Sequence, residues 1–117
     1  MTNGLREEIH RMHAHLCSAL ADPNRILILY TLTQGEINVS DLAEEVGLSQ
    51  PSVSRHLKVL RESGLAEATR EGHSMMYRLT DFRVIEALDI LRCVLADNLE
   101  KQVALARSAT QTLSSSN

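Results

Sequence analysis

The stretch that decides the fold reads LSQPSVSRHLKVLRESGL and runs from Leu48 to Leu65. Its apolar residues Val53, Leu57 and Leu60 recur at i, i+4 and i+7, which is the spacing of one face of a helix. The opposite face carries short polar and basic side chains, mostly near the N-terminus of the segment. A helix over 49–63 is therefore expected to bury one face and to offer hydrogen-bonding groups on the other.

A second, shorter helix is expected just before this one. Ser40 is suited to be the N-cap of the segment DLAEEV, and Gly47 tolerates the left-handed conformation that closes a helix. Ser49 then caps the helix that follows. Two helices joined by so tight a turn form a helix-turn-helix.

The pattern becomes alternating after Gly64. Residues 65–70 and 75–79 are predicted to be two strands, and the segment between them, 71–74, is predicted to be the tip of a hairpin. A hairpin directly after a helix-turn-helix corresponds to the wing of a winged-helix protein.

Two further helices are expected before the helix-turn-helix. Residues 5–20 place apolar side chains on one stripe at steps of three or four. Asp22 is a plausible N-cap and Pro23 a first residue for the next helix. That helix is apolar nearly all round, so it is expected to be central and buried and to end at Gly35.

The last helix is expected to be long and to be capped by Thr80 or Asp81. Its apolar stripe consists of Val84, Leu88, Leu91, Leu95 and Leu99. The predicted fold is thus mainly α with a small two-stranded antiparallel β wing, a winged helix-turn-helix. Residues 1–107 form its single domain, with terminal helices over about 5–20 and 81–107, and residues 108–117 form a polar C-terminal tail.

Composition narrows the class of protein. The chain has 117 residues, enough for one domain with a single core. No apolar run of about 18 residues is present to span a membrane, and the charged N-terminus does not resemble a signal peptide. Cys17 and Cys93 do not form the cysteine framework of a secreted module. A cytoplasmic location is therefore expected.

The net charge of −3 hides an uneven distribution. Residues 50–78 hold five Lys or Arg and three Glu, a local charge of +2, whereas the rest of the chain carries −5. Binding to a polyanion depends on the charge of the local patch more than on the net charge of the chain.

A recognition helix presents its N-terminal side chains to base edges in the major groove, where Gln suits adenine and Arg suits guanine. Serine, lysine and free amides suit phosphates.

Three segments of the chain resemble a known family. The segments ADPNRILILYTL, VSDLAEEVGLSQPSVSRHLKVLRESGLAE and REGHSMMYRL are similar to the ArsR/SmtB (arsenic-repressor) family of bacterial winged-helix repressors. The resemblance covers roughly residues 16–95. It implies a homodimer formed through the first and last helices, which binds a pseudo-palindromic operator and is released by an inducer. The expected DNA-binding residues are Gln50, Ser52, Ser54, Arg55, His56 and Lys58 on the helix and Arg70 and His73 on the wing.

The inducer sites that the resemblance implies are largely missing. Residues 37–45 hold no Cys or His, so the family's two-cysteine metal site is absent. Asp81 matches the first ligand of the family's zinc site on the last helix, but Arg83 and Val94 stand where histidines are expected.

Two cysteines remain as candidates. The resemblance implies that the first and last helices meet, an arrangement that would allow Cys17 and Cys93 to approach one another. They would then form a disulfide or sulfur bridge, or hold a two-thiol ligand such as a trivalent organoarsenical. A weaker alternative is a metal site from His13, Cys17 and Cys93. The third alternative is that neither cysteine senses anything, because cysteine is often only a small buried hydrophobe.

Two other functions are alternatives to a DNA-binding repressor. One is a winged-helix module for protein–protein contact, with its acidic surface as the binding surface. The other is a small metallohydrolase that uses the segment HRMHAHLC. That segment lacks a His-Glu pairing, and the chain has no Gly-rich phosphate loop, so no enzymatic activity and no required cofactor are expected.

Overall fold

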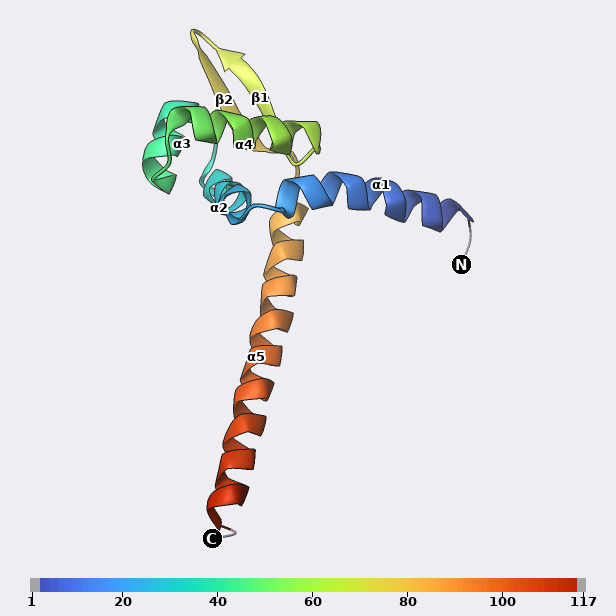
Figure 1. The fold of residues 1–117 in the computed structure, drawn as a ribbon. Coiled ribbons are helices and arrows are strands. Elements are labelled where there is room, and N and C mark those ends of the chain that lie inside the picture. Colours follow the sequence, from blue (N-terminus) through green and yellow to red (C-terminus); the bar gives the residue numbers. More distant parts are fainter. Residues whose placement is uncertain (1–2, 116–117) are drawn as a thin grey trace. The chain divides into compact units, whose positions relative to one another are not determined.

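The computed structural model describes residues 3–115, with side chains up to residue 111. The chain forms two compact units, of which the first ends at Phe82 and the second begins at Arg83. The first unit contains α1 (Asn3–Leu20), α2 (Pro23–Thr31), the 3₁₀ helix η1 (Leu32–Gln34), α3 (Val39–Val46), α4 (Gln50–Glu62), β1 (Ala66–Glu71) and β2 (Ser74–Leu79) (Figure 1). The second unit contains α5 (Arg83–Ser115).

Helix α2 begins as the sequence predicts. The Asp22 carboxylate accepts a hydrogen bond from the backbone N–H of Asn24 at 2.8 Å, and proline occupies the first turn. The helix packs against α1, α3 and α4 and buries Ile28 and Leu29. The helical stretch ends at Gly35 as predicted, but its last residues, Leu32–Gln34, form the 3₁₀ helix η1. One expectation for this segment was wrong, because Leu27 is exposed and one side of α2 therefore faces solvent.

The helix-turn-helix has the predicted turn but a different first cap. Helix α3 is capped by Asn38 and not by Ser40, because Asn38 has extended backbone and its side-chain oxygen accepts from the Asp41 N–H at 2.8 Å. Gly47 closes α3 in the left-handed conformation, with φ of 72°. Ser49 caps α4 as predicted. The turn therefore joins α3 to α4 in three residues.

The predicted inner face of α4 is confirmed. Val53, Leu57 and Leu60 are among the most deeply buried side chains of the described residues. The helix packs against α1, α2, α3 and β1, and the buried Leu42 of α3 belongs to the same core. Burial of these three side chains holds α4 on the domain and leaves its other face outward.

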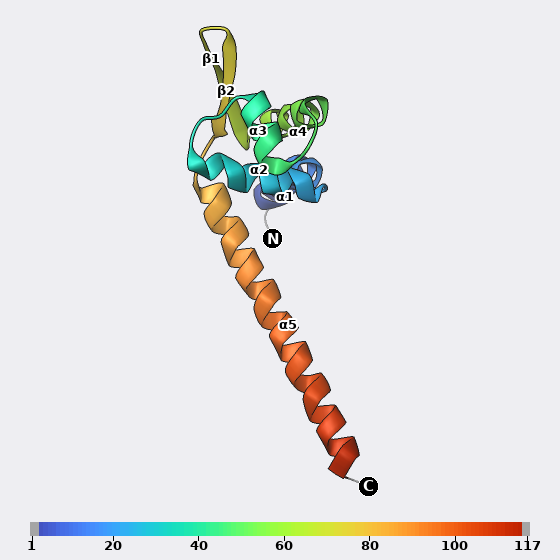
Figure 2. The ribbon, with the colours of Figure 1, turned by 90° about the vertical axis from the view of Figure 1, so that its left-hand side faces the viewer.

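The wing is an antiparallel hairpin whose register runs from Ala66 opposite Leu79 to Glu71 opposite Ser74. Its tip is thus two residues and not four, and Gly72 has a φ of 63°, as the first central residue of a type II′ turn requires. Ile37 pairs with Tyr77 through two backbone hydrogen bonds of 3.1 and 2.8 Å. This bridge anchors the base of the wing, which extends beyond α3 and α4 (Figure 2).

Helix α5 differs from the expectation at both ends. It begins at Arg83, so neither Thr80 nor Asp81 directly precedes its first turn. It continues to Ser115, past residue 107, where a polar tail was predicted. Residues such as Ala106 and Ala109 favour a helix, and the Thr110 hydroxyl donates to the Ala106 carbonyl at 2.9 Å. No helix in the described part of the chain is long and apolar enough to cross a membrane.

Candidate nucleic-acid interface

The outward face of α4 carries most of the predicted DNA-binding side chains. Ser54, Arg55 and Lys58 are exposed on the side opposite the buried stripe, and Ser52 is half-buried in the first turn. Gln50 is exposed, and its amide donates to the hydroxyl of Ser40 on α3 at 3.3 Å. The first three turns of α4 therefore present hydroxyls, an amide and two cations to solvent on a rigid support.

His56 does not belong to this outward group. Its side chain is only 12% exposed, and its Nδ1 lies 3.2 Å from Nη1 of Arg25. Its Nε2 lies 3.9 Å from a carboxylate oxygen of Asp22. The expectation that His56 contacts DNA is corrected by these contacts. The spacing of His56 from Val53 already indicated this inward position. A residue three positions after Val53 lies at the edge of the buried stripe and not on the opposite face of the helix.

The wing supplies a second exposed group. Arg70 and His73, both predicted to contact DNA, are exposed close to the hairpin tip. Arg78, which was not singled out, is engaged within the wing. Its Nε donates to Glu67 at 2.9 Å and its Nη1 donates to Thr69 at 3.0 Å. Arg78 thus offers less free charge to a polyanion than Arg70 does.

A pair of carboxylates lies beside Arg78. Glu36 is 3.5 Å from Nη1 of Arg78, and a hydrogen bond to Glu36 raises the pKa of Glu71. The negative charge of Glu36 and partial desolvation raise this pKa further, whereas Arg78 lowers it. Because the folded state raises the pKa, protonation of Glu71 favours the fold at low pH. That contribution is lost as the pH rises through the raised pKa.

This carboxylate pair leads to a pH-dependent prediction. Glu71→Gln is expected to bind duplex DNA about two- to fivefold more tightly near pH 7, because the wing loses a negative charge. The gain should shrink as the pH falls toward the raised pKa of Glu71, because the wild-type carboxylate then takes up a proton. Fluorescence anisotropy across this range measures both affinities, with Glu7→Gln on α1 as the control. A gain that does not change with pH would contradict the raised pKa.

The candidate inducer residues are accessible. Cys17 and Cys93 are both free thiols and both exposed. Within residues 3–115, no three His, Cys, Asp or Glu side chains are grouped so that they could hold a metal ion. The roles assigned to His13, Cys17 and Cys93 therefore stay predictions.

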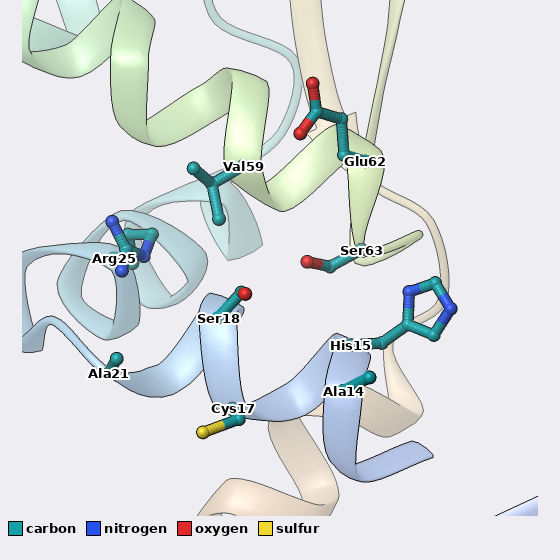
Figure 3. Close-up of a pocket in the computed structure, with 9 residues that line it drawn as sticks. All are labelled: Ala14, His15, Cys17, Ser18, Ala21, Arg25, Val59, Glu62 and Ser63. Atoms are coloured by element: carbon teal, nitrogen blue, oxygen red, sulfur yellow. The ribbon is translucent and has the colours of Figure 1, made fainter. Parts of the chain in front are cut away.

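A cavity of about 560 Å³ lies between α1 and the C-terminal part of α4. Figure 3 shows small side chains of α1, such as Ala14 and Ser18, on one side and Val59 of α4 with the C-cap residue Ser63 on the other. The sulfur of Cys17 points away from α4 in this view.

A helix-turn-helix followed by a two-stranded wing, with a polar and basic outward face at the start of α4, defines the class of winged helix-turn-helix DNA-binding proteins. Residues 22–68 match the sequence profile described as bacterial regulatory protein, arsR family. The chain belongs to this arsR family.

The relatives agree with this assignment. The chain is 36% identical over 89 residues to the biofilm growth-associated repressor of Xylella fastidiosa, covering 76% of this chain and 77% of that protein. It is 39% identical over 85 residues to a probable mercury resistance operon repressor of Streptomyces lividans, covering 73% and 68%. The solution structure of the homodimeric winged helix-turn-helix DNA-binding domain of Mb0332 from Mycobacterium bovis superposes with a TM-score of 0.72 at 30% identity. It covers 86% of this chain and 92% of that one.

Proposed function

We propose that the protein is a homodimeric, sequence-specific DNA-binding transcriptional repressor that a small inducer releases from its operator. The observation that carries the proposal is the division of α4 into a deeply buried apolar face and an exposed polar and basic face. The two relatives named as repressors and the homodimeric DNA-binding domain of Mb0332 support it.

The outward residues of α4 have distinct roles in this proposal. Arg55 reads a base edge in the major groove, where its planar fork suits guanine. Lys58 and the serines near the helix start bind phosphates and set the register. Arg70 and His73 on the wing contact the duplex beside the major groove. The short side chains of Ser52 and Ser54 let the helix backbone approach the DNA closely.

The dimer forms through helices whose apolar stripes are exposed in the single chain. Leu5 and Ile9 of α1 are exposed, and so are Leu91 and Leu95 of α5. A two-fold axis through such an interface places two α4 helices about one DNA turn apart, which matches a pseudo-palindromic operator. We therefore assign the exposed stripes of α1 and α5 to the contact with the second subunit.

We assign the binding site of the inducer to the two cysteine thiols. Cys17 and Cys93 are exposed and free to react with an oxidant or a persulfide, or to bind an organoarsenical or a metal ion. The similarity to a probable mercury resistance operon repressor supports a thiol-binding inducer.

A salt titration tests the proposed function. Binding of the purified protein to a random-sequence duplex is measured by fluorescence anisotropy at about 50 mM and 200 mM salt. Because phosphate contacts release counterions, the affinity is expected to fall about a hundredfold between the two conditions, which corresponds to roughly four phosphate contacts. An absence of salt-dependent binding would favour the alternative, a winged-helix module that binds another protein.

A further inference from the structure

A polar cluster joins three helices of the first unit. The Arg25 guanidinium donates from Nε to the carbonyl of Ala19 at the end of α1, at 3.2 Å. The same group donates from Nη1 to Nδ1 of His56 in the middle of α4, also at 3.2 Å. Asp22 caps α2 and lies 3.9 Å from the other ring nitrogen of His56. The cluster thus connects the end of α1, the start of α2 and the middle of α4.

The chemistry of this cluster is specific to arginine and histidine. A guanidinium only donates hydrogen bonds, so Nδ1 of His56 must accept, and the ring proton lies on Nε2, toward Asp22. Arginine reaches two acceptors at once because its donors form a planar fork. A lysine at position 25 has the charge but a single nitrogen, so it cannot reproduce both contacts in the same geometry.

The polar cluster adds directional contacts to the apolar packing of α4. The buried stripe of Val53, Leu57 and Leu60 holds the helix on the core, but hydrophobic contact is non-directional. Arg25 also lines a pocket of about 560 Å³ beside α1 and the C-terminal part of α4, together with Val59 and Ser18 (Figure 3). The hydrogen bond from Arg25 to His56 is directional, and it therefore adds an orientational constraint to this packing.

We propose that Arg25 and His56 are positioning residues, which set the orientation of α4 relative to α1 and thereby the spacing of the two recognition helices in the dimer. This inference rests on the proposed function, in which α1 belongs to the dimer interface and α4 enters the major groove. Because His56 is turned inward, it acts on DNA recognition through the backbone of α4 and not through a base contact.

The test separates affinity for one half-site from affinity for two correctly spaced half-sites. The full-length protein first selects a pseudo-palindromic duplex from a random pool. Three probes are then compared by anisotropy: this duplex, one isolated half-site, and the duplex with one base pair inserted at its centre. The variants are His56→Leu, which removes the acceptor, and Arg25→Met, which removes the donors. His56→Asn retains an acceptor close to the position of Nδ1 and serves as the conservative variant.

His56→Leu and Arg25→Met are expected to bind the selected duplex about tenfold more weakly, which is the size of one hydrogen bond to a charged group. Their affinity for the isolated half-site should change less than about twofold, and their preference over the inserted probe should fall about tenfold. His56→Asn should recover most of this preference. The double variant should lose no more than Arg25→Met alone, because that change already removes the hydrogen bond that the two residues share.

Three results would overturn the inference. An equal loss on the half-site and on the full duplex would mean that His56 contacts DNA directly. A loss that follows the folded fraction in circular dichroism melts, and that His56→Asn does not recover, would assign the cluster to stability alone. Wild-type behaviour of all variants on the three probes would remove the role altogether. If the wild-type protein shows no salt-dependent DNA binding, the proposed function itself fails, and that result is distinct from the other three.

Discussion

Leu95→Glu is expected to convert the protein from a dimer to a monomer. Leu91, Leu95 and Leu99 recur on one face of α5 and are 55%, 67% and 61% exposed in the single chain. A dimer through this face buries Leu95, so a glutamate there would lose its hydration without gaining a partner. The penalty is several kcal/mol, and the dissociation constant of the dimer should rise about a hundredfold or more. Operator affinity should fall with it, because each subunit then binds one half-site alone.

Sedimentation velocity over a concentration series measures this change. The matched control is Ala104→Glu, which adds the same charge to an exposed position of the same helix. Ala104 lies nine residues after Leu95 and, at about 100° per residue, on the opposite face. A Leu95→Glu protein that sediments as a wild-type dimer would show that this stripe is not the interface. Equal dissociation of both variants would point to an effect of charge and not of the stripe.

Arg55→Ala is expected to weaken operator binding by about tenfold to a hundredfold and to relax the preference at one base pair. The side chain is exposed and opposite the buried stripe, so its removal should leave the melting temperature unchanged. Leu57→Ala is the opposite case, because this side chain is 1% exposed. Its truncation should lower the free energy of unfolding by about 2–5 kcal/mol.

Competition with a panel of single-base operator variants shows whether Arg55 reads a base. Lys58→Ala provides the comparison, because a phosphate contact has no sequence preference. It should weaken binding to all duplexes alike and reduce the slope of affinity against salt by about one. If Arg55→Ala keeps the full base preference, or if it lowers the melting temperature as Leu57→Ala does, the assignment of Arg55 to the groove is wrong.

The sequence alone determined the elements that depend on neighbouring residues. The spacing of Val53, Leu57 and Leu60 predicted the buried face of α4, and the structure confirms it. Asp22 and Ser49 were recognised as caps because a cap bonds to a backbone amide two or three residues away. Where two such residues competed, local pattern was insufficient, since both Asn38 and Ser40 are good caps and only the backbone conformation selects Asn38.

The tertiary structure decided the features that depend on residues far apart in the chain. The inward direction of His56 follows from Arg25, which lies 31 positions earlier, and the engagement of Arg78 follows partly from Glu36, 42 positions earlier. Ile37 joined the base of the wing only because Tyr77 lies opposite it. Periodicity reports which face of an element is apolar, but a polar side chain at the edge of that face takes its direction from its partners. For this protein the sequence determined that α4 has an outward face, and the tertiary structure decided which of its residues lie on it.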